Sequence, residues 1–163
     1  ALLSSIFVIA LYVWIRFDWQ FAFAGILALL HDVVLSIGFM SIFNIEFNLT
    51  MIAAILLIAG YSINDTIVLF DRLRTLSSQE DIKIDLPSMI NSSISLNLRR
   101  TILTSFTTIL ALVCLVVLAP VNLTEMPIVF IFGVLIGTYS SIFLGLPIIS
   151  SLNYESVLKS RDS

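Results

Sequence analysis

The sequence is poor in charge and cysteine, and it lacks the short motifs that bind phosphate or metal ions. Only 12% of its 163 residues are charged, and the single cysteine, Cys114, excludes a disulfide within the chain. No GxxxxGK[ST] loop, CxxC or HExxH motif occurs, which leaves ATP hydrolysis and metal chemistry unsupported. The eight basic residues form no stripe for a nucleic-acid backbone. We therefore expect no enzyme activity, no metal or organic cofactor and no nucleic-acid partner.

Hydrophobic residues are abundant instead, at 59% of the chain with a mean hydropathy of +1.09. Such values exclude a disordered chain and an ordinary soluble domain. A helix that crosses a bilayer needs about 20 mainly apolar residues. Five segments approach or exceed that length: 1–15, 21–43, 49–70, 102–119 and 128–152. The sequence predicts an all-α, polytopic bundle of transmembrane helices in a single domain, 1–163.

The basic residues fall on one side of this predicted bundle. Successive breaks between spans alternate sides of the membrane, and the second and fourth breaks hold no Lys or Arg. The basic residues lie in the first break, the third break and the tail: Arg16, Arg72, Arg74, Lys83, Arg99, Arg100, Lys159 and Arg161. Because Lys and Arg collect in cytoplasmic loops, these segments and the C-terminus are predicted to be cytoplasmic. The first span would then enter from outside, so we expect a further span upstream of Ala1.

The third break, 71–100, divides into a polar loop and an amphipathic segment. Residues 75–85 are polar and acidic, and the apolar residues that follow recur at near-helical spacing. Pro87 suits a first helical turn. We predict an amphipathic helix over 87–98 that lies at the inner membrane surface before the fourth span.

Asp65 is the residue on which the functional hypothesis rests. It lies in the third predicted span, with Asn64 beside it and Tyr61 and Ser62 one turn earlier on the same helix face. A charged carboxylate at bilayer depth costs several kcal/mol, about 2.5–3.5 on insertion scales, so Asp65 needs a partner, a water cavity or a proton. We expect Asp65 to take up and release a proton; the alternative is a static salt bridge to an arginine of the next span.

The candidate cations for Asp65 are Arg99 and Arg100, at the inner mouth of the fourth span. A movable cation would switch Asp65 between its protonated and ionised forms, whereas arginines that only anchor the span at the interface would not. Hydroxyl residues follow them at helical spacing: Thr101, Thr104, Ser105 and Thr108. Such a stripe could line a hydrated path or hold helices together, and both readings stay open.

His31 and Asp32 lie near the middle of the second span, about 15 Å from its inner end at 1.5 Å per residue. Neighbouring residues diverge by about 100° on a helix, so we expect the two side chains to face different neighbours. Each could form a fixed hydrogen bond with an adjacent helix. Either could instead assist a proton relay, because histidine titrates close to working pH.

Small residues recur every four positions in the fifth predicted span, at Gly133, Gly137 and Ser141. Small residues at this spacing allow two helices to approach closely. We therefore expect this face to pack against another helix.

The stretch GYSINDTIVLFDRLR, residues 60–74, resembles the fourth-span motif of the SecF group in the SecD/SecF family of bacterial protein-export membrane proteins. Four further stretches are similar to that family: YVWIRF at 12–17, LHDV at 30–33, RTILTS at 100–105 and GTYSSIF at 137–143. The resemblance implies a helical bundle similar to one half of the membrane domain of a resistance-nodulation-division transporter. It implies that Asp65 is the protonating carboxylate and Arg99 or Arg100 its basic counterpart, and that His31 and Asp32 match the family's third-span pair.

The same resemblance implies a function and a set of partners. The chain would pair with SecD, associate with the SecYEG channel, and have YajC and YidC as further partners in the bacterial cytoplasmic (inner) membrane. It would use the proton-motive force, with protons as the coupling ion, to promote preprotein export. The preprotein itself would be contacted by an external domain outside this chain. Two other hypotheses remain: one half of a proton-driven small-molecule exporter, and a structural membrane subunit.

Overall fold

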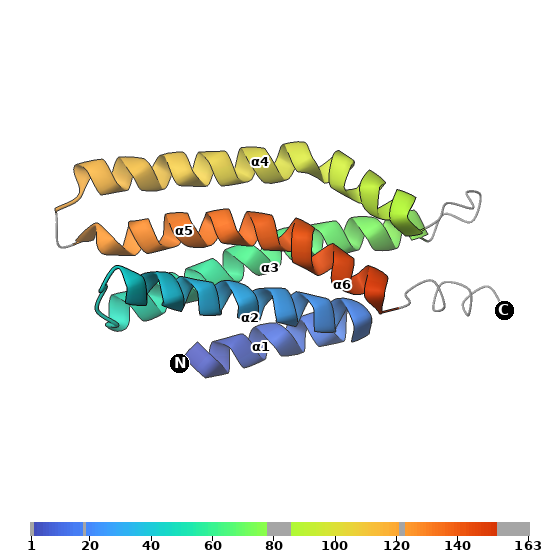
Figure 1. Cartoon of the computed structure of the whole chain (residues 1–163), viewed down its shortest axis with the longest axis horizontal. Helices are drawn as coiled ribbons and strands as arrows, with labels where there is room; N and C mark the ends of the chain where they lie inside the picture. Colours follow the sequence, from blue (N-terminus) through green and yellow to red (C-terminus); the bar gives the residue numbers. More distant parts are fainter. Residues whose placement is uncertain (1, 18, 78–85, 121–122, 153–163) are drawn as a thin grey trace.

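The computed structural model describes residues 2–17, 19–77, 86–120 and 123–152, which form helices and the short connections between them. The elements are α1 (Leu2–Arg16), α2 (Trp19–Ile42), α3 (Leu49–Ser77), α4 (Leu86–Leu118), α5 (Glu125–Ser140), the π-helical turn η2 (Ser141–Gly145) and α6 (Leu146–Ser151). The predicted all-helical fold is confirmed. From α1 to α5, successive helices run antiparallel along the long axis of the molecule, and α6 continues in the direction of α5 (Figure 1).

Among the described residues, four helical segments are long and apolar enough to cross a membrane: Trp19–Ile42, Leu49–Leu76, Ser88–Leu118 and Glu125–Ser151. They correspond in order to the second to fifth predicted spans. α1, at the first predicted span, is a shorter apolar helix of 15 residues that ends at Arg16.

Two helices extend beyond the membrane spans predicted for them. α3 continues past Phe70 to Ser77, and the predicted interfacial helix 87–98 is not a separate element but the first turns of α4, a continuous helix of 33 residues. No proline or glycine follows Pro87 within α4, so nothing in the backbone ends the helix at Leu98. The change from polar to apolar residues marks an expected membrane boundary, not a helix boundary. Residues 78–85 of the predicted loop lie outside the described residues.

The last span changes its helical geometry partway along. α5 passes into the π-helical turn Ser141–Gly145 and then into α6, where Pro147 lies in the first turn. A proline has no N–H to donate and its ring crowds the carbonyl four residues earlier, here that of Phe143. The wider π turn accommodates this crowding and keeps the segment helical through to Ser151.

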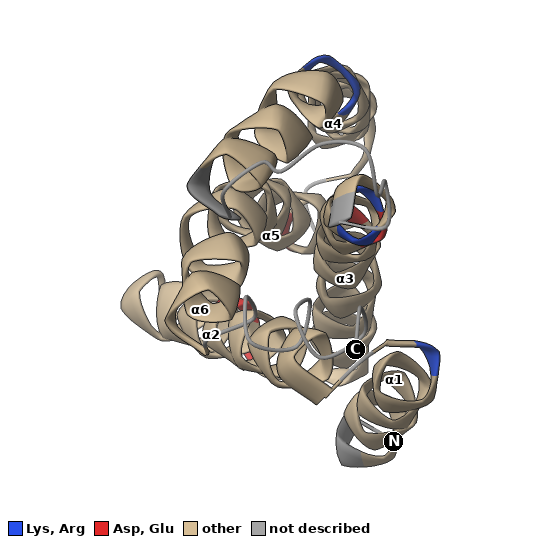
Figure 2. Ribbon diagram, turned by 90° about the vertical axis from the view of Figure 1, so that its right-hand side faces the viewer, with Lys and Arg blue, Asp and Glu red and all other residues tan. Residues whose placement is uncertain are grey.

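α5 is the centre of the bundle, because it packs against α2, α3 and α4, while α1 lies outside α2 and α3 (Figure 2). Buried aromatic and aliphatic side chains form one core around Phe21 and Phe70. A second core surrounds Leu29 and Ile58. The outward face of α4 exposes large apolar side chains such as Phe106, as expected for a surface that contacts lipid or another membrane protein.

Candidate functional site

Asp32 is a carboxylate with no exposed surface, held between α2, α3 and α5. Its Oδ1 lies 3.0 Å from Nδ1 of His31. Its Oδ2 accepts hydrogen bonds from the hydroxyl of Ser62 and, at 2.7 Å, from that of Ser140. Contrary to the expectation that neighbouring side chains would face different partners, His31 bonds the adjacent Asp32. The remainder of the partly exposed imidazole borders an apolar cavity of about 320 Å³ between α2 and the end of the last span.

Asp65 is also buried, at 6% exposure, but its carboxylate is not satisfied. Its Oδ2 is buried and has no hydrogen-bond partner among the described residues. Within that part of the chain, no ion pair joins Asp65 to an arginine. Arg100 of α4 is the cation close enough to act on Asp65 electrostatically. In the described residues, Arg100 thus acts on Asp65 from the neighbouring helix, and no ion pair is formed between them.

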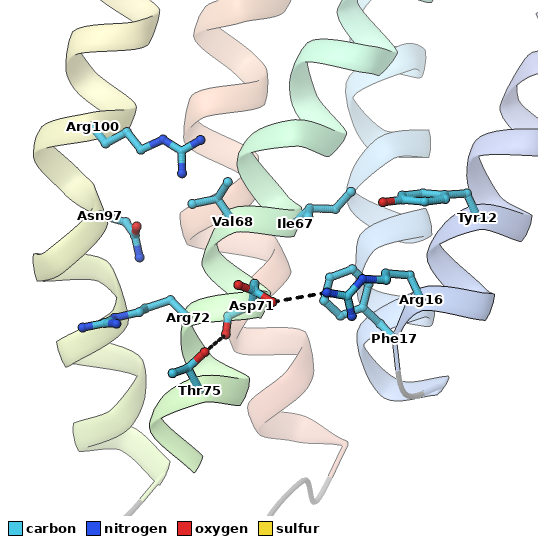
Figure 3. Close-up of a pocket in the computed structure, with 10 residues that line it drawn as sticks. All are labelled: Tyr12, Arg16, Phe17, Ile67, Val68, Asp71, Arg72, Thr75, Asn97 and Arg100. Carbon is cyan, nitrogen blue, oxygen red and sulfur yellow. Dashed lines mark hydrogen bonds and ion pairs between the residues drawn. The ribbon is translucent and has the colours of Figure 1, made fainter. Parts of the chain in front are cut away.

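A polar cavity of about 380 Å³ opens at the arginine-rich end of the bundle, between α1, α3 and α4 (Figure 3). Three arginines and one carboxylate contribute to its wall: Arg16, Arg72, Arg100 and Asp71. Arg16 and Asp71 form an exposed ion pair at 3.8 Å. Arg100 lies deeper along the bundle than Asp71, level with Val68, which is one helical turn from Asp65 (Figure 3). The cavity thus extends from the end of the bundle to the neighbourhood of Asp65.

A chain of hydroxyl groups joins three helices near the same site. Tyr61 of α3 donates a hydrogen bond to Ser105 of α4 at 3.2 Å, and Ser105 bonds Thr138 of α5 at 2.6 Å. Tyr61 and Ser105, which the sequence analysis names separately as supporting residues, therefore lie in contact and connect two helices. Thr104 is exposed, and its hydroxyl bonds main-chain oxygens of its own helix. Asn64 is exposed as well, so these two predicted supporting residues lie away from the buried groups.

The small residues of α5 lie against α3. A Cβ atom on Gly133 would overlap the side chain of Ile58, and one on Gly137 would lie 3.1 Å from Cβ of Ser62. Ser141 is buried and donates to the main-chain oxygen of Thr138 at 3.1 Å.

Ser140 is a contact residue that sequence reasoning missed, as is Thr138. Ser140 bonds Asp32, although 108 positions separate the two residues in the sequence. The available signal was its position three residues after Gly137, which puts both on one helix face.

The fold and these buried polar groups define a multi-pass α-helical membrane protein with ionisable side chains inside its helix bundle. Comparison with known proteins identifies the family to which the chain belongs. The chain belongs to the SecD/SecF family, because the model of the C-terminal region of the protein export membrane proteins SecD and SecF matches residues 1–155. The resemblance inferred from the sequence is confirmed.

Relatives of known name agree with the family assignment. The chain is 44% identical over 150 residues to protein translocase subunit SecF of Rickettsia rickettsii and to that of Rickettsia akari, matches that cover 92% of this chain and 48% of each relative. The chain thus spans about half the length of these curated relatives. Both relatives are named as subunits of a protein translocase.

Solved structures agree on the fold. A crystal structure of SecDF in a super-membrane-facing form superposes with a TM-score of 0.84 at 36% identity, over 97% of this chain and 22% of that one. SecDF from Thermus thermophilus, described as a translocon-associated membrane protein, superposes with a TM-score of 0.82 at 39% identity, over 89% of this chain and 20% of that one. The predicted likeness to a SecDF transmembrane region is confirmed.

Proposed function

We propose that this chain is the transmembrane, proton-coupled part of a SecF-type subunit that uses the proton-motive force to promote preprotein export. Its protein partners are SecD, which supplies the other half of the membrane domain, the SecYEG channel, and YajC and YidC. Its location is the bacterial cytoplasmic membrane. Figure 2 shows the basic residues of α1, α3 and α4, and because positive residues collect on the cytoplasmic side, the arginine-rich end and the C-terminus face the cytoplasm.

The proposal rests on the carboxylate of Asp65. It is buried near Arg100, and its Oδ2 has no hydrogen-bond partner among the described residues. A buried charge needs a partner, and a buried carboxylate without one is stable only as the neutral acid. Asp65 therefore has two stable arrangements. In one arrangement Asp65 is protonated, and its neutral side chain does not attract the guanidinium of Arg100. In the other it is ionised and attracts Arg100. Because the two residues lie on different helices, the exchange of a proton changes the attraction between α3 and α4.

The membrane potential supplies enough energy for this exchange to move the helices. One elementary charge that crosses 100 mV gains about 2.3 kcal/mol. Coupling free energies between sites are typically about 1–3 kcal/mol. A single proton per cycle is thus sufficient to shift a two-state equilibrium between α3 and α4. The polar cavity that reaches Val68 and Arg100 provides a hydrated exit toward the arginine-rich end.

The proposal is tested by Asp65→Asn in the full-length parent protein, assembled with its partners in inverted membrane vesicles. The measurement is completion of preprotein export with and without a proton-motive force. We expect Asp65→Asn to insert and assemble normally but to lose the stimulation by the gradient, because the amide binds no proton. The matched control is Glu46→Gln, which also replaces a carboxylate by an amide, at an exposed residue that does not line the polar cavity, and it should retain stimulation. Unchanged stimulation in Asp65→Asn would instead indicate a structural subunit.

A further inference from the structure

Asp32 and Asp65 are both buried acidic residues, but their surroundings differ. Both carboxylate oxygens of Asp32 are occupied, Oδ1 by the imidazole of His31 and Oδ2 by two serine hydroxyls. A proton on Oδ2 would compete with the two serine donors, and a proton on Oδ1 would lie in the bond to Nδ1 of His31. Asp65, by contrast, has a buried oxygen that accepts nothing from the described residues. The geometry therefore suits Asp65 to exchange a proton and Asp32 to hold its neighbours in place.

The neighbours that Asp32 holds lie on the two helices next to the site. Ser62 is on α3, one turn before Asp65, and Ser140 is on α5. The two backbones come close there, because a Cβ on Gly137 would lie 3.3 Å from Cα of Ser62. This close approach lets one oxygen of Asp32 accept from both serines. α2, α3 and α5 are thereby joined at a single buried point.

We propose that Asp32 is a positioning residue: by anchoring Ser62 and Ser140 to α2, it sets the orientation of the α3 face that carries Asp65 toward Arg100. The inference rests on the proposed proton exchange at Asp65. α3 would pivot about its anchored turn when Asp65 gains or loses a proton. The anchored turn is also held from within, because the buried hydroxyl of Thr66 donates to the main-chain oxygen of Ser62 at 3.1 Å.

Few charged groups act on these two carboxylates from the described residues. Arg100 of α4 is the cation that acts on Asp65. At Asp32, the titratable neighbour is His31 of its own helix, while α3 and α5 present serine hydroxyls. Loss of a hydroxyl at Ser62 or Ser140 thus alters the position of Asp65 without adding or removing a charge.

The test measures how readily Asp65 is protonated. A hydrophobic carbodiimide modifies protonated carboxyl groups inside membranes, and mass spectrometry of the full-length protein assembled with its partners reports the modification of Asp65 as a function of pH. We expect Ser62→Ala and Ser140→Ala each to shift this curve by about 0.5 pH unit or more, a roughly threefold change in the protonated fraction at fixed pH. Asp32→Asn should shift it at least as far.

The matched control is Ser36→Ala. Ser36 is equally buried, but its hydroxyl donates to the main-chain oxygen of Asp32 and not to the carboxylate. We expect the Ser36→Ala curve to coincide with that of the unchanged protein. The proposal is overturned if assembled Ser62→Ala and Ser140→Ala both give the unshifted curve. It is also overturned if Asp32 is itself modified, because that would make Asp32 an exchanging group.

The positioning proposal and the proposed function can fail separately. If Asp65→Asn keeps gradient-stimulated export while the serine variants still shift the modification curve, Asp32 positions a titrating residue that does not drive export. If Asp65→Asn loses stimulation but the serine variants leave the curve unshifted, the proton-coupling function stands and the positioning role is refuted.

Discussion

Replacing Gly133 by alanine tests the close approach of α3 and α5 that brings the buried polar groups together. The new Cβ would overlap the side chain of Ile58, which has no exposed surface. Crowding of this kind costs about 1–3 kcal/mol. Alanine favours a helix over glycine by about 0.5–1 kcal/mol. The crowding is larger, so we expect a net destabilisation of about 1 kcal/mol, caused by the contact with the Ile58 side chain.

The matched control for this change is Gly60→Ala, in α3. Nothing lies within 4 Å of a Cβ at Gly60, so only the helix propensity should act, and the variant should be unchanged or more stable by up to about 1 kcal/mol. The assay is the free energy of unfolding of the purified full-length subunit in detergent micelles, titrated with SDS.

A second substitution shows whether Ile58 is the cause. Ile58→Ala removes the atoms that the new methyl group would meet, so Gly133→Ala with Ile58→Ala should be less destabilised than the sum of the single changes, by about 0.5–3 kcal/mol. The packing argument is refuted if Gly133→Ala behaves like Gly60→Ala, or if the two changes simply add.

Three further predictions concern the residues around the site. In gradient-stimulated export, Arg100→Gln should lose the stimulation and Arg99→Gln should keep it, because Arg100 lines the polar cavity and acts on Asp65; equal effects would contradict this assignment. Tyr61→Phe should lower the free energy of unfolding in SDS by about 0.6 kcal/mol, the average for a hydrogen bond between membrane helices, and a loss several times larger would show a different role. A double-mutant cycle on the exposed ion pair of Arg16 and Asp71 should give a coupling below about 1 kcal/mol.

The order of the spans could be predicted because hydropathy is a local property of the sequence. The ends of α3 and α4 at the arginine-rich side could not be predicted, because polar residues end an apolar run without ending a helix. α3 therefore continues to Ser77, and α4 begins at Leu86. A membrane boundary and a helix boundary coincide only where the backbone changes, as at the left-handed Asn44 (φ 53°) between α2 and α3.

The sequence could predict single residues of the candidate site, but it could not predict which residues these side chains contact. Asp65 stands out because a charge inside an apolar run is visible from its neighbours in the sequence. Its surroundings depend on how distant segments pack, so neither the choice of Arg100 nor the bond between Ser140 and Asp32 could be derived from spacing. Spacing also grouped Thr104 with Ser105, although Thr104 is exposed and Ser105 is buried, because the helix turns about 100° from one residue to the next.

The most direct measurement of proton binding at Asp65 is infrared difference spectroscopy of the assembled full-length protein during a pH change, which detects the carbonyl band of a protonated carboxyl group. We predict a band that appears on acidification, is absent in Asp65→Asn and is retained in Asp71→Asn. If the same band persists in assembled Asp65→Asn, the proton is bound elsewhere, and Asp65 is not the residue that couples proton movement to this membrane domain.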